Sequence, residues 1–289
     1  MALSDHAKGI LITSTGVLVF TPDALLVRLT AVDAFTLSVG RGLIGGAIVL
    51  GLCQFLYAGS VVQQLRTLGL WGLAVALLQA VSAILFLVAL ERTSAANVLI
   101  FFATAPLIAA GLAWVFLRER VPRVTLLAML LCLLGLAVVV SGSLGGGNLS
   151  GDLVGLVNAC MIAGFYVVIR RRRDVNMIPA LGFGMLLGAV IAAPFAGYPA
   201  MVPMQWLWLV LGGAIVFPVA LMLLTLGPRY LPAPEVAMLT LLETVLGPFW
   251  VWLALGEDPG PRSLIGGAII VFVLLGHAIL RLRGERQVA

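Results

Sequence analysis

The chain has 289 residues, of which 62% are hydrophobic and 10% are charged. A water-soluble domain carries about a quarter charged residues, so this composition excludes an ordinary soluble protein. The net charge of +5 does not indicate a nucleic-acid partner, because the basic residues gather in short connections between apolar segments, where they set membrane topology.

Ten apolar segments follow one another along the chain. Each is close to the roughly 20 residues that a helix needs to cross a hydrocarbon core about 30 Å thick. In lipid the backbone must satisfy its own hydrogen bonds, and unbroken apolar runs predict helices rather than the alternating strands of a barrel. The predicted fold class is therefore an all-α integral membrane protein. The predicted spans are residues 7–29, 34–57, 70–90, 94–117, 123–143, 151–170, 178–197, 205–227, 233–255 and 263–281.

The basic residues are unevenly distributed between the two sides of the predicted bundle. Thirteen Lys and Arg residues, with the run at 170–173 among them, fall on the side that holds both termini, and only Arg28, Arg92 and Arg262 fall on the other. Short loops rich in Lys and Arg stay in the cytoplasm. We therefore predict a multi-pass protein of the cell (inner) membrane with both termini in the cytoplasm.

The two halves of the chain repeat each other at two offsets, 142 residues in the early spans and 138 in the later ones. The paired residues are Gly9 and Gly151, Arg28 and Arg170, Gly40 and Gly182, Gly42 and Gly184, and Gly46 and Gly188, followed by Ala95 and Ala233, Trp114 and Trp252, Leu117 and Leu255, and Glu119 and Glu257. The predicted repeats are residues 1–145 and 146–289, joined by a flexible linker rich in Gly, Ser and Asn at 143–152.

Five spans in each repeat insert the second copy upside down, which predicts two inverted five-helix repeats. Each half can then adopt either of two packings, and their exchange converts an outward-open cavity into an inward-open one. The symmetry therefore favours a transporter that works by alternating access.

Two stretches carry a resemblance to a known family. "TSAANVLIFFATAPLIAAGLAWVFLRERVP" at 93–122 and "LPAPEVAMLTLLETVLGPFWVWLALGEDPG" at 231–260 each begin with small residues, contain a proline past the middle and close on a glutamate. In this they resemble EamA-type members of the drug/metabolite transporter (DMT) superfamily, although "RE" at 118–119 departs from the commoner "GE". The resemblance implies ten helices in two repeats, with helices 3, 4, 8 and 9 and parts of 1 and 6 around a central cavity. By overall likeness the chain is also similar to YddG-type exporters of aromatic and other amino acids.

Two charged residues of the first two spans are expected to meet. Asp23 in "FTPDALLVR" and Arg41 in "VGRGL" both fall about 10 Å below the outer surface by the helical rise of about 1.5 Å per residue. Equal depth predicts an ion pair. The pair would serve as a clasp between two helices or as an outer gate, or Arg41 would bind a substrate carboxylate.

Aromatic and amide residues at helical spacing suggest cavity walls. The expected wall residues are Gln79, Ser82 and Phe86 on the third span, Asn97 and Phe101 on the fourth, and Asn158 and Phe165 on the sixth. The alternative is that the aromatic residues pack the bundle and the amides hydrogen-bond across helices. A mostly apolar cavity suits neutral zwitterions with bulky side chains better than sugar phosphates, which require basic residues at the midplane.

The ninth span contains an acidic residue, Glu243, about ten residues, or about 15 Å, from its start and thus near the midplane. A carboxyl at this depth costs about 2.5–3.5 kcal/mol on insertion scales, so it is expected to face a cavity or a partner. Thr240 and Thr244 place hydroxyl groups nearby. Two roles remain open for Glu243: it binds a substrate ammonium or carries a coupling proton, or it is a protonated, hydrogen-bonded acid that stabilises packing.

In the fourth and ninth spans, Pro106 and Pro248 interrupt helical hydrogen bonds and predict hinges.

Other classes of protein lack support in the sequence. The only lysine, Lys8, follows Ala7, which rules out a Walker motif, and the chain contains no HExxH, GxSG or GxGD motif of an intramembrane enzyme. The three cysteines lie in predicted spans at unrelated spacings, so we expect no metal site and no cofactor.

The sequence predicts a secondary transporter that exports small metabolites, in particular aromatic and other amino acids, as a monomer or a homodimer. An exporter of drugs or other small organic solutes and a passive channel are the alternatives.

Overall fold

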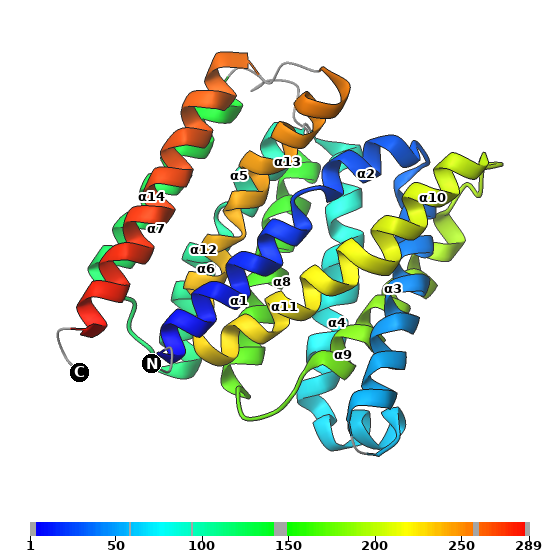
Figure 1. Cartoon of the computed structure of the whole chain (residues 1–289), viewed down its shortest axis with the longest axis horizontal. Coiled ribbons are helices and arrows are strands. Elements are labelled where there is room, and N and C mark those ends of the chain that lie inside the picture. Colours follow the sequence, from blue (N-terminus) through cyan, green and yellow to red (C-terminus); the bar gives the residue numbers. More distant parts are fainter. Residues whose placement is uncertain (1–3, 58, 94, 142–148, 257–259, 287–289) are drawn as a thin grey trace.

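The computed structural model describes residues 4–57, 59–93, 95–141, 149–256 and 260–286. In these ranges every regular element is helical, and ten helical spans are long and apolar enough to cross a membrane. The spans lie alongside one another in a single bundle, and both termini lie at one end of it (Figure 1). The predicted linker is only partly described, and the predicted boundary between the repeats falls outside the described residues.

Five spans form the first half of the bundle. They are α1 (Asp5–Phe20) with α2 (Asp23–Thr30); α3 (Ala34–Leu56); α4 (Val61–Arg92); α5 (Ala95–Phe102) with α6 (Ala105–Leu112) and the π-helix η1 (Ala113–Leu117); and α7 (Arg123–Val140). Five more form the second half. They are α8 (Leu149–Arg171); α9 (Ile178–Ala192) with the 3-10 helix η2 (Ala193–Phe195); α10 (Pro203–Leu211) with the π-helix η3 (Gly212–Val216) and α11 (Phe217–Tyr230); α12 (Ala233–Leu239) with α13 (Leu241–Leu255); and α14 (Gly260–Arg286).

The third span begins earlier than predicted. It was expected at 70–90, whereas α4 starts at Val61 and bends at Gly69, which has φ 54° and ψ −140°. Glycine reaches this backbone conformation because it has no Cβ. The first turns of α4 therefore form a separate helical piece before the bend, within the span Val61–Phe86.

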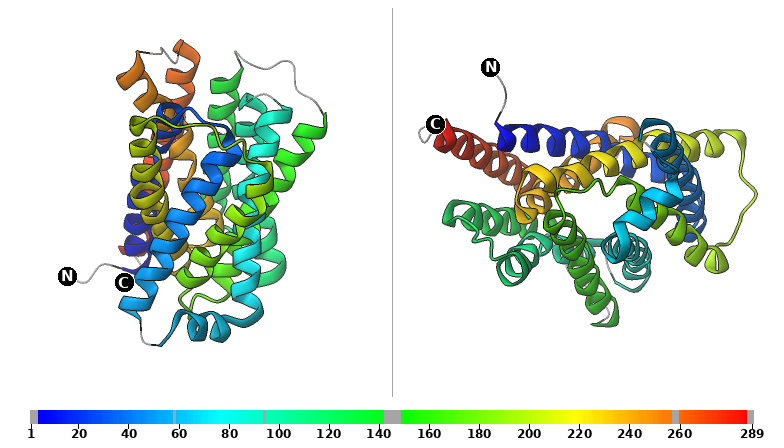
Figure 2. Two further views of the ribbon diagram at one scale, coloured as in Figure 1. Left: turned by 90° about the vertical axis from the view of Figure 1, so that its right-hand side faces the viewer. Right: turned by 90° about the horizontal axis from the view of Figure 1, so that it is seen from below.

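Equivalent helices of the two halves contact each other. The second spans α3 and α9, the fourth spans α6 and α12, and the fifth spans α7 and α14 form such pairs. The extensive contact of α4 with α8 is matched by that of α11 with α1, which is the same pair of positions with the halves exchanged. Because each half has five spans and both termini lie at one end (Figure 2), the second half is inverted relative to the first. The predicted fold class is confirmed.

Three spans break at a threonine whose hydroxyl donates to the carbonyl three residues earlier. The bonds run from Thr21 to Leu18 (2.9 Å), from Thr104 to Phe101 (2.6 Å) and from Thr240 to Ala237 (2.8 Å). Backbone groups in apolar surroundings need partners within the protein wherever helical hydrogen bonds are broken. These hydroxyls supply a donor at the end of α1, between α5 and α6, and between α12 and α13.

Paired glycines bring α3 and α9 close together at one side of the bundle (Figure 1). A Cβ on Gly42 would lie 2.7 Å from the Met185 carbonyl oxygen and 2.8 Å from the Ala189 Cβ, and one on Gly46 would lie 3.0 Å from the Gly182 carbonyl oxygen. Side chains larger than hydrogen therefore do not fit here. Small residues one turn apart thus allow close contact between these helices.

This close approach predicts that Gly42→Ala lowers the stability of the folded protein. The new methyl group meets backbone atoms of α9, and such overpacking costs about 1–3 kcal/mol. Thermal unfolding in detergent should show a lower midpoint. The matched control is Gly51→Ala on the same helix, where a Cβ has no neighbour within 4 Å and helix propensity favours alanine by about 0.5–1 kcal/mol. Equal midpoints for the two variants would contradict this account of the helix crossing.

Candidate functional site

The two ends of the bundle are packed to different degrees. The terminal face is the end formed by the first turns of α1, α7 and α12 and the last turns of α8 and α14. Here every residue of α12 (Ala233–Leu239) is buried. The equivalent residues of the first half lie 138 positions earlier at the opposite face, and of those at 97–101 only Val98 is buried. The start of the ninth span is therefore packed more tightly at the terminal face than its counterpart in the fourth span is at the opposite face.

Asp23 and Arg41 form an ion pair between the first and second spans. Arg41 Nη2 lies 2.8 Å from Asp23 Oδ1, and both side chains are largely buried. Asp23 is the first residue of α2, where the positive end of the helix dipole favours a carboxylate. The Arg41 guanidinium also covers the Phe217 ring of α11, at 4.2 Å from its centroid. Arg41 thus joins α2, α3 and α11, and its role as a gate remains a prediction.

Glu243 lies in the first turn of α13, directly after the break at Thr240. Its side chain is half-buried, and it interacts electrostatically with Asp23, Arg41 and Tyr166. Thr240 and Thr244 donate their hydroxyl groups to the carbonyls of Ala237 and Leu241 within their own span. Both hydroxyl groups therefore already donate their proton within the helix. Toward a ligand or Glu243 they can act only as hydrogen-bond acceptors.

Two predicted wall residues from different spans meet directly. The Ser82 hydroxyl of α4 donates to Asn158 Oδ1 of α8 at 2.7 Å. Nearer the opposite face, the Asn97 amide donates to Asp152 at 3.0 Å, and Thr93 donates to the same carboxylate at 2.7 Å. The amides thus link helices across the bundle, as intramembrane amides often do.

The remaining predicted wall residues lie in different surroundings. Gln79 is half-buried where α4 passes Gly184 of α9, and Phe101 packs against Gly155 of α8. Phe86 is half-buried as well. Phe165 is 5% exposed and belongs to the packed core near the terminal face, with its ring edge-on to Tyr166. In this packing Phe165 is a core residue rather than the wall of an open space.

The two prolines lie in different local structures. Pro106 follows the break between α5 and α6 at the start of α6, which is where a hinge would be expected. By contrast, α13 continues through Pro248, and the break in that span lies at Thr240. Proline removes one helical hydrogen bond in either place. Of these two spans, the fourth breaks next to its proline and the ninth does not.

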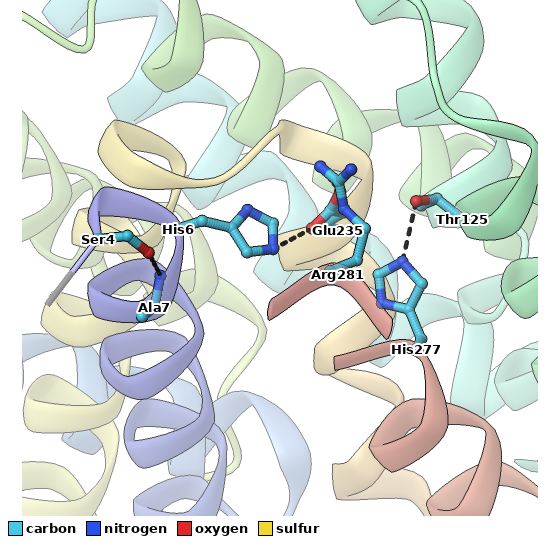
Figure 3. A network of polar contacts seen from close by, with 7 residues as sticks. All are labelled: Ser4, His6, Ala7, Thr125, Glu235, His277 and Arg281. Carbon is cyan, nitrogen blue, oxygen red and sulfur yellow. Dashed lines mark hydrogen bonds and ion pairs between the residues drawn. The ribbon is translucent and has the colours of Figure 1, made fainter. Parts of the chain in front are cut away.

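A charged network crosses the terminal face, and Figure 3 shows it from close by. Glu235 of α12 is 2% exposed; its carboxylate lies 3.4 Å from His6 Nε2 of α1 and 3.2 Å from Arg281 Nη2 of α14. One turn before Arg281, the His277 Nε2 lies 2.9 Å from the Thr125 hydroxyl of α7. These contacts join the first, fifth, ninth and tenth spans.

A second ion pair lies beside this network. Arg170 at the end of α8 directs its Nε to Glu119 Oε1 at 3.0 Å, while its Nη1 donates to the Pro228 carbonyl at 3.2 Å. The pair connects the end of the fourth span to the sixth and eighth.

Sequence reasoning did not single out Glu235, His6 or Arg281 as site residues. Glu235 carried a usable signal, since acids are rare in membrane spans and this one stands in the first turn of the ninth. His6 carried none, because its partners come from distant parts of the chain. Among the residues that the structure describes, no group of three His, Cys, Asp or Glu side chains could hold a metal ion.

Comparisons with known proteins agree with this architecture. The model of the EamA-like transporter family matches twice, at residues 7–141 and at residues 149–278. A solved crystal structure of a protein with 22% sequence identity superposes with a TM-score of 0.82, covering 95% of this chain and 98% of the other, which shows a shared fold. A comparison with curated proteins found no match.

The pairing of Asp23 with Arg41 predicts a partial rescue by charge exchange. Asp23→Arg or Arg41→Asp alone places two like charges together, which should cost at least as much as removing one partner from a buried pair, about 3–5 kcal/mol. The double variant restores an ion pair but loses the contact with Phe217 and puts a cation at a helix N-terminus, so its stability should fall between the single variants and the wild type. The readout is the thermal unfolding midpoint. A double variant no more stable than the weaker single variant would rule out a stabilising pair.

Proposed function

The chain belongs to the EamA-like transporter family, and from this premise we propose that it is a secondary transporter that exports small metabolites by alternating access. We further propose aromatic and other amino acids as its substrates. In the predicted topology the terminal face lies in the cytoplasm, so export is flux from the terminal face to the opposite one.

The single observation that carries this proposal is the position of Glu243. The carboxyl is half-buried, follows the break of the ninth span, and lies within electrostatic range of the pair formed by Asp23 and Arg41. A carboxyl held at mid-depth by a discontinuous helix is typical of substrate and ion sites in secondary transporters. We propose that Glu243 binds the substrate ammonium group or carries a coupling proton.

The surroundings of Glu243 support an amino acid more than a sugar phosphate. The nearby cation, Arg41, is already paired with Asp23, so the site offers no cluster of basic groups for a phosphate dianion. Toward the opposite face, the half-buried side chains of Phe86, Phe101 and Asn97 would suit a bulky substrate side chain with few polar contacts.

Alternating access is supported by the unequal packing of two pseudo-symmetric segments. Residues 233–239 are buried, whereas their counterparts in the first half are mostly half-buried. Segments of related sequence can exchange these two environments, which would open the terminal face and close the opposite one. The interruptions at Thr104 and Thr240 are where we expect the fourth and ninth spans to bend.

The function is tested by uptake of labelled aromatic amino acids into proteoliposomes, with and without an imposed pH gradient. We expect saturable flux that unlabelled amino acid on the far side accelerates, because a carrier returns faster when loaded. Linear flux without such acceleration would indicate a channel. Transport of other organic solutes in place of amino acids would assign a different substrate class.

Glu243→Gln should remove the pH dependence of transport or its selectivity for substrates with an ammonium group. Glutamine keeps the shape of the side chain but neither ionises nor binds a cation as strongly. The measurement is flux across a pH series, together with the unfolding midpoint to show that the variant folds.

The control is Asp174→Asn, which removes a carboxylate from an exposed pair with Arg172 and should leave the pH profile unchanged. If the Glu243 variant retained the wild-type pH profile and selectivity, Glu243 would be a structural acid.

A further inference from the structure

A cavity of about 310 Å³ opens at the terminal face between the ends of the fourth, sixth and tenth spans and the starts of the fifth and ninth. This volume is at the lower end of the range of small-molecule pockets, about 300–1,000 Å³. Its charged lining residues are Glu119, Arg120, Arg170, Glu235 and Arg281, and most of the remainder is proline and small apolar side chains. The cavity thus presents both signs of charge in a space that fits one small metabolite.

The acidic and basic groups of this cavity differ in how many hydrogen-bond partners they already have. Glu119 receives only the Nε of Arg170, to its two oxygens at 3.0 and 3.3 Å, rather than a two-nitrogen fork. Its side chain is 35% exposed, so acceptor capacity remains accessible. Arg120 is exposed, and within the described part of the chain its guanidinium has no ion pair or hydrogen bond. One carboxylate and one guanidinium, adjacent in sequence, are therefore available to a ligand.

We propose that this cavity is the loading site at which a zwitterionic amino acid binds from the terminal face before the bundle opens there. This inference rests on the proposed function. The substrate carboxylate binds the free fork of Arg120, and the substrate ammonium binds Glu119. A simple anion would meet two glutamates, and a simple cation would leave Arg120 unpaired, whereas a zwitterion complements both groups.

The location of the cavity connects binding to the fourth span. Ala113 lines the cavity and begins η1, which ends at Arg118 in a left-handed conformation with φ 58°. The Glu119 amide donates to the Ala113 carbonyl at 3.3 Å. Irregular turns of this kind often mark functional sites, because they can change hydrogen-bond register at low cost. Ammonium binding weakens the hold of Arg170 on Glu119 and so loosens the fourth span from the sixth.

Packing beyond the cavity explains why a separate loading site is needed. α12 packs against α6, and its residues Ala233–Leu239 are all buried. A substrate at the terminal face therefore cannot reach Glu243 in this packing. It can occupy the cavity, whose rim includes Pro232 and Pro234 at the start of the same span.

The test is transport kinetics of Arg120→Gln in proteoliposomes sorted by which face of the protein lies outside. For a labelled aromatic amino acid, we expect the half-saturating concentration to rise about fivefold to tenfold from the terminal face, the effect of losing one charge-assisted hydrogen bond. From the opposite face it should stay unchanged. Arg120→Lys should recover part of the loss, because lysine keeps the charge without the fork.

The matched control is Arg123→Gln, an equally exposed arginine that does not line the cavity. It should leave both half-saturating concentrations at the wild-type value. The amide of the same amino acid, which lacks the carboxylate, should be insensitive to Arg120→Gln.

Three results would overturn the loading site: equal changes from both faces, no change from the terminal face, or the same change in the control. They differ from a failure of the proposed function, in which the wild-type protein itself shows no saturable amino-acid flux.

Discussion

The whole structure depends on the need of every backbone polar group to find a partner inside an apolar environment. Helices meet this need within one segment, and ten of them account for the bundle. Three spans that break at a threonine show the same constraint locally. At each break a threonine hydroxyl donates to a carbonyl of the preceding turn, as Thr240 does to Ala237. Irregular backbone can therefore exist at mid-depth, and it is next to such a break that Glu243 lies.

The two halves of the bundle have related sequences and folds, but their equivalent segments are packed differently. The inverted halves pair through equivalent helices, and α3 and α9 cross closely at Gly42 and Gly46. In the ninth span α12 is fully buried, while the equivalent part of the fourth span is not. The proposed alternating access requires two segments with related sequences and different packing, because each must tolerate both environments.

The ninth span carries charge at two levels, and the two carboxylates differ in accessibility. Glu235 is almost completely enclosed by His6 and Arg281 at the terminal face, whereas Glu243 is half-buried at mid-depth. The enclosed carboxylate holds the closed end together through contacts with the first and tenth spans. The half-buried one is the group that a small solute could approach, and the break at Thr240 separates the two.

Sequence alone determined the fold class, the ten spans, the inverted repeat and the depth of Glu243, because these follow from hydrophobic length, residue offsets and the helical rise. It also placed Asp23 and Arg41 at one level, since equal depth can be counted along two neighbouring helices. Only the tertiary structure decided which side chains meet across distant spans. His6, Glu235 and Arg281 form one network, Phe165 belongs to the core, and the ninth span breaks at Thr240 rather than at Pro248. Rotation of each helix about its axis and the choice of open end are set by packing between segments far apart in the chain, and periodicity within one segment cannot specify them.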